Sequence, residues 1–292
     1  MIDSVNDIAA GFERLGYVAD RALATALFLL MKLRKPILIE GPAGVGKTEV
    51  AKVLSRLLNT DLIRLQCYEG LDASSSLYEW NYQKQLLAIK IHDSAPESTE
   101  EKEKHIFGSD FLLSRPLLKS ITAEQSSPVL LVDEVDRADE AFEAFLLELL
   151  SDFQISIPEM GTIKAKHIPH VVLTSNRTRE LSDALKRRCL YHWIPYPTVE
   201  KEIRIVRAKL PGIEELLSVQ VVRFVQAIRQ KRLHKLPGVV ETLDCAAALV
   251  SLGKDKLNPE AVEETLGCVL KTAEDMDRIR SEGIESILSQ AL

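Results

Sequence analysis

The feature that most constrains the fold is a glycine-rich loop between a short apolar run and an amphipathic helix, within residues 36–58. The apolar run, residues 37–39, is typical of a buried parallel strand. After the loop, apolar residues recur at helical spacing and share one face: Val50, Val53, Leu54, Leu57 and Leu58. A strand, a loop and a helix in this order are the framework that a phosphate-binding loop needs.

The loop itself reads GPAGVGKT over residues 41–48 and fits the pattern G-x-x-x-x-G-K-[ST]. Its glycines allow several N–H groups to turn towards one phosphate, and the N-terminus of the following helix adds positive partial charge. The ammonium of Lys47 can reach the β- and γ-phosphate oxygens, and the hydroxyl of Thr48 can bind Mg²⁺. We therefore predict that ATP binds here with Mg²⁺, against Gly41, Pro42, Ala43, Gly44, Val45, Gly46, Lys47, Thr48 and Glu49.

The alternative is a glycine-rich turn that only joins a strand to a helix. At average residue usage, a chance match to the pattern somewhere in this chain is a roughly one-per-cent event. The flanking strand and helix lower that chance further, so the pattern favours nucleotide binding.

Composition narrows the classes of protein. The 292 residues are 46% hydrophobic and 27% charged, as in an ordinary globular protein of one large or two unequal domains. The net charge of −6 makes nucleic acid an unfavoured partner. We expect a cytoplasmic protein without membrane insertion, because no apolar stretch is long enough to cross a bilayer and the N-terminus carries no signal pattern. The cysteines are far apart and indicate reduced thiols: Cys67, Cys189, Cys245 and Cys268.

Apolar periodicity predicts the remaining elements. Strands are expected at residues 62–66, 129–133, 170–174 and 190–194, and a hairpin at 154–165. Helices are expected at residues 3–33, 78–91 and 140–150, with 107–121 helical or partly so. The mixed-charge residues 96–104 predict a mobile surface loop. Beyond Pro195-Tyr-Pro197 the patterns are helical, which predicts an α/β nucleotide-binding domain over 1–195 and a helical lid domain over 196–292.

Four aromatic residues cluster between positions 68 and 82: Tyr68, Tyr78, Trp80 and Tyr82. They can pack in the core beneath a helix, or they can form a loop that grips a partner. We favour packing.

Two acids end the apolar run at 129–132. A parallel sheet delivers ligands to its carboxyl edge, so Asp133 is a candidate for holding Mg²⁺ there. Glu134 points differently and can polarise an attacking water. A solvated helix cap would be favoured for an isolated Asp-Glu pair. In the same chain as the phosphate loop, the catalytic interpretation is favoured.

Two further candidates follow in the chain. Asn176 comes directly after the apolar run at 171–174 and can position the water or sense the γ-phosphate, or it can simply cap a turn. Arg187 and Arg188 end an expected helix, where cations favour the helix dipole. Their functional interpretation is an arginine that reaches a neighbouring subunit's γ-phosphate.

With these residues in place, the chain resembles an AAA+ ATPase over nearly its whole length. GPAGVGKT resembles Walker A, VLLVDE resembles Walker B, Asn176 matches sensor 1, and Arg188 matches the arginine finger, with Arg187 as the alternative. The run DEVDRA at 133–138 and the hairpin at 154–165 resemble the MoxR group. Residues 68–91 and 237–244 look most like the CoxD-type ATPase that accompanies molybdenum carbon monoxide dehydrogenase.

The resemblance implies a fold, an activity and partners. The fold is a phosphate-loop αβα sandwich with a parallel five-stranded sheet, followed by an all-α lid. The activity is hydrolysis of ATP with Mg²⁺ by a ring, expected to be a hexamer, that acts as a chaperone or remodelling motor in metalloenzyme maturation. The implied partners are a protein with a von Willebrand factor A domain and a metalloenzyme client.

One position departs from the resemblance. Many MoxR proteins carry a sensor 2 arginine where this chain has Glu241, and Arg223 and Lys231 are candidate substitutes. This departure keeps a second function open, an assembly switch that responds to nucleotide with little turnover. A DNA-associated AAA+ protein is a further alternative, which the acidic charge disfavours. A small-molecule kinase would need a substrate pocket that the sequence does not indicate.

Overall fold

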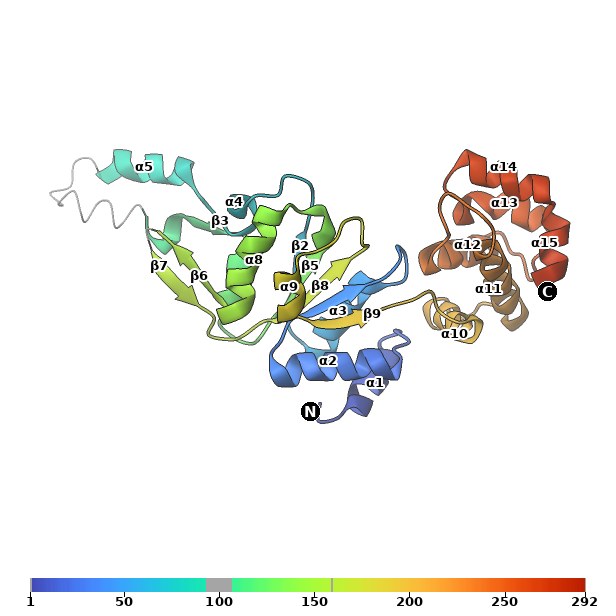
Figure 1. The fold of residues 1–292 in the computed structure, drawn as a ribbon, viewed down its shortest axis with the longest axis horizontal. Helices are drawn as coiled ribbons and strands as arrows, with labels where there is room; N and C mark the ends of the chain where they lie inside the picture. Colours follow the sequence, from blue (N-terminus) through green and yellow to red (C-terminus); the bar gives the residue numbers. More distant parts are fainter. Residues whose placement is uncertain (1, 93–106, 159, 292) are drawn as a thin grey trace. The chain divides into compact units, whose positions relative to one another are not determined.

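The computed structural model describes residues 2–92, 107–158 and 160–291, and its contacts divide them into two compact units (Figure 1). The sheet unit comprises Thr25–Glu40 and Leu54–His192. The helical unit comprises Met1–Ala24, Gly41–Val53 and Trp193–Leu292. The loop expected at residues 96–104 lies outside the described residues. The division into domains at residue 195 stays a prediction, since the phosphate loop makes its contacts with the helical unit.

A five-stranded sheet organises the fold. Its order is β2-β5-β8-β1-β9, and the pairs β2–β5, β5–β8 and β1–β8 are parallel. The strands are β1 (Ile37–Glu40), β2 (Leu62–Gln66), β5 (Val129–Asp133), β8 (His170–Ser175) and β9 (Leu190–Trp193). The strand predictions and the α/β fold class with a helical C-terminal region are confirmed.

The central strands are apolar because both of their faces are covered. Every residue of β1 and β5 is buried. On one face, Leu38, Leu130 and Leu173 belong to a core that also contains α7 (Pro116–Ile121) and α8 (Glu140–Asp152). The residues between them in the strands are equally buried, as a sheet with helices on both sides requires.

Residues 3–33 are largely helical, as expected, but they form two helices, α1 (Val5–Arg14) and α2 (Arg21–Leu33), separated by a turn. The Ser4 hydroxyl caps α1 by accepting the Asp7 N–H at 3.2 Å. The chain turns at Gly16, whose φ of +75° is a left-handed conformation that glycine adopts at low cost.

The helix predicted over residues 78–91 begins later than expected. β3 (Tyr78–Trp80) pairs with β4 (Leu112–Ser114) in antiparallel fashion, and α5 (Tyr82–His92) follows. Residues 107–121 are only partly helical, with η1 (Ser109–Phe111), then β4, then α7. The short strands escape prediction because their pairing partner lies more than thirty residues away in the sequence. A short helix, α4 (Ala73–Ser76), precedes β3.

The hairpin expected at residues 154–165 is present. β6 (Gln154–Ile157) and β7 (Gly161–Lys164) pair in antiparallel fashion, with Ile155 opposite Ile163. Ile155 and Ile157 are buried and belong to the core of the sheet unit. The alternating apolar residues of β6 therefore attach the hairpin to that core.

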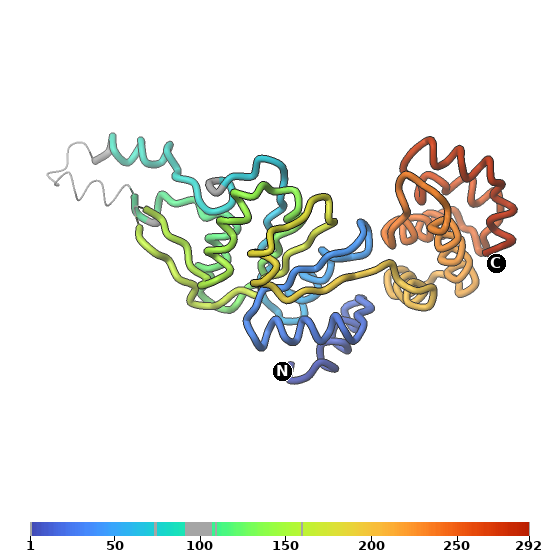
Figure 2. The backbone as a smooth tube through the Cα atoms, viewed as in Figure 1, coloured from blue at the N-terminus to red at the C-terminus, as the bar shows by residue number. Residues whose placement is uncertain are grey.

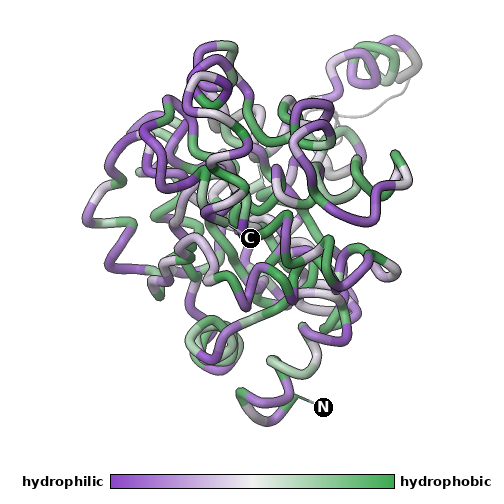
Figure 3. Tube along the Cα trace, turned by 90° about the vertical axis from the view of Figure 1, so that its right-hand side faces the viewer, coloured by the Kyte–Doolittle hydropathy of each residue, from purple (hydrophilic) through white to green (hydrophobic). Residues whose placement is uncertain are grey.

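The aromatic cluster is divided between core and surface. Trp80 is buried and packs edge-on against Tyr78 and Phe107, with ring centroids 5.9 and 5.4 Å apart. Tyr68 and Tyr82 are 50% and 65% exposed, so the packing interpretation is wrong for these two. α5 also exposes Leu86 and Leu87, and its trace carries apolar colour beside the grey segment in Figure 3.

Helices make up the C-terminal part of the helical unit, as Figure 2 shows in orange to red. Phe224 and Val225 are buried, and the Asn258 side chain caps its helix by accepting the Ala261 N–H at 2.8 Å. None of the helices in the described ranges is long and apolar enough to cross a membrane. The helices are α10 (Val199–Lys209), α11 (Glu215–Arg229), α12 (Val239–Ser251), α13 (Pro259–Val269), α14 (Ala273–Glu282) and α15 (Ile284–Ala291).

Candidate functional site: a phosphate loop and an acidic sheet edge

The phosphate loop follows β1 directly and belongs to the helical unit. Gly44 and Gly46 have φ angles of +75° and +93°, which favour glycine. A Cβ atom on Gly41 would lie 2.2 Å from the Ile194 carbonyl oxygen, so a side chain does not fit there. The backbone of the loop therefore requires glycine at all three glycine positions of the motif.

Lys47 begins α3 (Lys47–Leu58), and its ammonium turns back over the loop. Its Nζ donates to the carbonyl oxygens of Gly41 and Pro42 at 2.8 and 2.6 Å, and the side chain is buried. Thr48 follows in the first helical turn, half-buried. A concave backbone, a held cation and a helix N-terminus together suit an anion such as a phosphate group. The residues present therefore fit a bound nucleotide.

A cavity of about 230 Å³ adjoins the loop within the helical unit. Its walls are largely apolar and include Tyr17, Val18, Val45 and Leu243. Burial raises the pKa of the Tyr17 hydroxyl, which therefore stays neutral. An apolar cavity beside an anion site suits a ligand with a flat apolar group and a charged group.

The acidic residues lie at the carboxyl edge of the sheet. Asp133 is the last residue of β5, and Asn176 follows the end of the neighbouring strand β8. The buried Asp133 carboxylate accepts a hydrogen bond from the Thr174 hydroxyl at 2.6 Å and from the Arg64 guanidinium at 2.6 Å. Sequence reasoning assigns no role to Thr174 and Arg64, because only the strand order brings them to Asp133.

Glu134 and Asn176 are brought together, as expected of a pair that acts on one water. The Asn176 amide nitrogen lies 3.4 Å from the Glu134 carboxylate, which also accepts from Gln66 and Arg137. Glu134 has a left-handed φ of +56°, and its N–H donates to the Thr174 hydroxyl at 2.9 Å. A left-handed backbone conformation at a non-glycine residue costs about 1–2 kcal/mol of conformational free energy. Such strain is concentrated at functional sites.

Asp136 was missed by sequence reasoning, yet it holds the Asn176 segment in place. It lies in η2 (Val135–Arg137), is 2% exposed, and accepts the N–H and hydroxyl of Thr178 at 2.8 and 2.7 Å. It also accepts the Asn176 N–H at 3.2 Å. An aspartate soon after a strand end is usually solvated, so no local pattern singles this one out.

Replacing Asp136 by asparagine is expected to misplace Asn176. Asparagine keeps the volume but removes the charge and one acceptor, which should cost about 1–3 kcal/mol in unfolding free energy. We expect kcat for ATP hydrolysis to fall roughly tenfold with an unchanged KM, because the residue acts on the catalytic geometry. Denaturant unfolding and steady-state kinetics measure both effects.

The matched control is Asp139→Asn. Asp139 caps α8 by accepting the Phe142 N–H at 2.8 Å and is exposed, and asparagine caps a helix equally well. If both variants hydrolysed ATP at the wild-type rate, Asp136 would have no positioning role.

The two finger candidates end α9 (Asp183–Arg188) in the sheet unit, and both are exposed. The Arg188 guanidinium donates to the Ser151 hydroxyl at 2.8 Å and to the Ala184 carbonyl at 3.1 Å. Whether Arg188 or Arg187 acts across subunits stays a prediction.

The candidate substitutes for a sensor 2 arginine lie on and after α11. Lys231 forms an ion pair with Glu282 at 2.8 Å, and Arg223 is exposed on α11. Glu241 does lie beside the loop: its Oε2 atom is 3.2 Å from the position that a Cβ on Gly44 would take.

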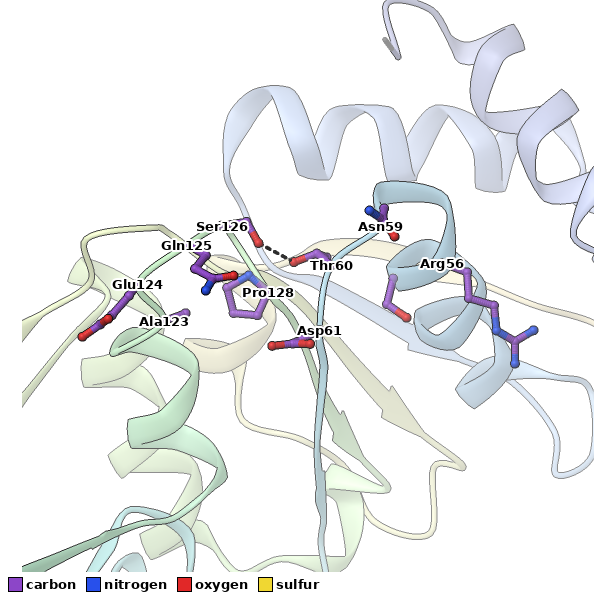
Figure 4. A pocket seen from close by; sticks show the side chains of 10 residues that line it. Arg56, Asn59, Thr60, Asp61, Ala123, Glu124, Gln125, Ser126 and Pro128 are labelled. Carbon is purple, nitrogen blue, oxygen red and sulfur yellow. Dashed lines mark hydrogen bonds between the residues drawn. The ribbon is translucent and has the colours of Figure 1, made fainter.

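A polar cavity of about 570 Å³ lies at the opposite, amino edge of the sheet (Figure 4). Asp61 and Pro128, which precede β2 and β5, line it together with Arg56. The Thr60 and Ser126 hydroxyls are joined across it at 3.0 Å. Because the acidic residues lie at the other edge, this cavity is separate from the candidate site.

The parallel sheet, the glycine loop and the acidic strand end define a phosphate-loop α/β protein. The sequence profile of the AAA domain (dynein-related subfamily) matches residues 36–189, more than half of the chain. The chain therefore belongs to this family of AAA+ ATPases.

Individual relatives are distant. The denitrification regulatory protein NirQ of Pseudomonas aeruginosa is 24% identical over 231 residues, covering 75% of this chain and 78% of NirQ. An uncharacterized protein of Staphylococcus haemolyticus is 25% identical over 207 residues, or 68% and 70% of the two chains. The solved structure of a RuvB point mutant from Thermotoga maritima superposes with a TM-score of 0.50 at 18% identity, covering 90% and 70%. That likeness concerns the fold alone.

Proposed function

We propose that this chain is an ATPase of the MoxR group that hydrolyses ATP with Mg²⁺ and works in the cytoplasm as a ring-shaped remodelling motor. The observation that carries the proposal is the cluster at the sheet edge, in which Asn176 contacts the strained Glu134 beside the buried Asp133. A switch that only binds nucleotide has no need of a strained carboxylate held by an amide.

Each predicted residue has a role in the proposed reaction. The loop N–H groups and the Lys47 ammonium bind the phosphates, and Thr48 and Asp133 hold Mg²⁺, which when bound neutralises charge on the phosphate oxygens. Glu134 accepts a proton from the attacking water, and Asn176 orients Glu134 and that water.

Two further groups complete the proposed site. Arg188, or Arg187 in its place, stabilises charge on a neighbouring subunit's γ-phosphate. The apolar cavity lined by Tyr17 takes the base, whose flat rings suit its walls.

The more specific parts of the proposal rest on the resemblance. They are the hexameric ring, the partner with a von Willebrand factor A domain, and a metalloenzyme client served by a CoxD-type protein. The likeness to NirQ, a denitrification regulatory protein, supports a regulatory role.

A second function, the switch with little turnover, is favoured by a specific observation. The Arg64 guanidinium occupies one carboxylate oxygen of Asp133 at 2.6 Å. This contact opposes the binding of Mg²⁺ by Asp133. A DNA-associated role has no such support, since the net charge is −6 and the RuvB likeness concerns the fold alone.

The test is particle mass in solution with and without ATP and Mg²⁺, with phosphate release followed in the same samples. The motor predicts a ring that assembles with nucleotide and turns ATP over. Assembly without phosphate release would establish the switch. A monomer that hydrolyses ATP equally well alone would contradict any role of Arg188 across subunits.

A further inference from the structure

The phosphate loop is in direct backbone contact with the start of α12. The N–H groups of Val239 and Val240 both donate to the Gly44 carbonyl, at 3.0 and 3.3 Å. The two glycines make this approach possible, because a Cβ on Gly238 would lie 2.8 Å from the Gly44 Cα and the Ala43 carbonyl oxygen. All of these residues belong to the helical unit.

The backbone of Gly238 is fixed from both sides. Its N–H donates to the Glu241 carboxylate at 2.8 Å. Its carbonyl accepts from the Arg229 guanidinium at 3.0 Å and from the Thr242 hydroxyl at 3.2 Å. Glu241, which stands where an arginine was expected, thus holds the segment that touches the loop.

A buried ion pair supports this arrangement. Arg229 is 8% exposed and Glu202 is fully buried, and they are joined at 2.6 and 2.7 Å. Arg229 also donates to the Pro237 carbonyl at 2.7 Å. Removing one partner of a buried ion pair leaves an uncompensated charge in the interior and strongly destabilises the fold. The folded protein therefore keeps both partners in place. The pair connects α10 and α11 to residues 237–238.

We propose that residues 237–240, here called the latch, couple occupancy of the phosphate loop to the helices α10–α12. Arg229 and Glu241 are its positioning residues. This inference rests on the proposed function, because it assumes that a nucleotide occupies the loop. The latch adds a regulatory contact to that function. This contact does not require a sensor 2 arginine that binds the phosphate.

The proposed coupling has its physical basis in one peptide group, whose carbonyl faces the latch and whose N–H can bind phosphate. The Gly44 carbonyl and the Val45 N–H belong to the same peptide unit, so hydrogen bonds to the oxygen polarise the unit and strengthen its N–H as a donor. A phosphate bound by the N–H strengthens the carbonyl as an acceptor in turn. Phosphate binding and latch closure therefore favour each other reciprocally.

The test compares two glycine-to-alanine variants. Gly238 has φ −85° and ψ −170°, which alanine adopts freely, so Gly238→Ala should separate the latch from the loop without straining its own backbone. Gly267→Ala is the matched control on α13, where the added Cβ makes an ordinary contact of 3.7 Å with Met276. We expect a fluorescent ADP to dissociate about tenfold faster from Gly238→Ala and at the wild-type rate from Gly267→Ala.

Hydrogen exchange at individual amides measures closure of the latch separately from the overall stability of the protein. Nucleotide should slow exchange of the Val239 and Val240 amides in the wild type and in Glu241→Gln, which keeps the acceptor for Gly238. It should not do so in Gly238→Ala or Glu241→Ala.

The outcomes separate the latch from the function on which it rests. If the wild type bound no nucleotide, the proposed function would fail and the latch with it. If Gly238→Ala bound nucleotide and matched the wild type in dissociation and exchange, the latch alone would be overturned.

Discussion

Replacing Lys47 by alanine is expected to abolish nucleotide binding while leaving the fold intact. The ammonium is buried over the loop and bonded to two of its carbonyl oxygens, so no other described side chain is held in the same place. Removing a buried cation that would face phosphate should cost about 3 kcal/mol or more, which weakens Kd roughly a hundredfold or beyond. Titration with a fluorescent ATP analogue measures the loss, and circular dichroism checks the fold.

The control is Lys52→Ala in the same helix. Lys52 is half-exposed, pairs with Glu49 at 3.7 Å, and carries the same charge, so its removal tests the effect of net charge. We expect Lys52→Ala to bind ATP as the wild type does. Normal ATP binding by Lys47→Ala would show that the loop does not hold phosphate, and the proposed function would fall.

Replacing Glu134 by glutamine is expected to retain ATP binding but stop hydrolysis. Glutamine keeps the volume and the contact with Asn176, yet it cannot accept a proton from water. The rate of phosphate release should fall by about 10²–10⁴-fold, the range for loss of a general base. Any oligomer that forms with ATP should then persist, because the nucleotide that holds it together is no longer consumed.

Glu140→Gln serves as the comparison, because Glu140 is exposed in the first turn of α8. It should leave turnover unchanged. Phosphate release at the wild-type rate from Glu134→Gln would mean that another group activates the water, and the role assigned to Asn176 would have to be revised with it.

The central strands of the sheet were predictable because they contain short apolar runs that are buried on both faces. β5 is apolar up to its last residue, Asp133, and β8 contains the apolar run 171–173, so the polar residues that follow these runs could be identified from the sequence. The phosphate loop was predictable for a different reason: its glycines, lysine and threonine stand at fixed spacing.

The supporting residues could not be predicted, because their partners are distant in the sequence. Asp136 meets Thr178 some forty positions away, and Arg64 meets Asp133 at a still greater separation. The pairing of β3 with β4 is of the same kind. Periodicity reports how a residue relates to its own helix or strand, and it carries no information on such contacts.

The helical C-terminal part shows both cases. The helical character of residues 196–292 was predictable from the sequence pattern, and it includes α11 and α12. The buried pair of Arg229 and Glu202 was not, since charged residues are mostly exposed and their burial depends on one specific partner.

The composition of the helical unit has a consequence for the order in which the chain can fold. Its three segments, Met1–Ala24, Gly41–Val53 and Trp193–Leu292, are separated by the two segments of the sheet unit. During synthesis the first two segments leave the ribosome long before the third, whereas the sheet unit has all of its strands once residue 193 has emerged. The phosphate loop therefore reaches its final surroundings only after the segment that begins at Trp193 has emerged, although the loop itself is synthesised early.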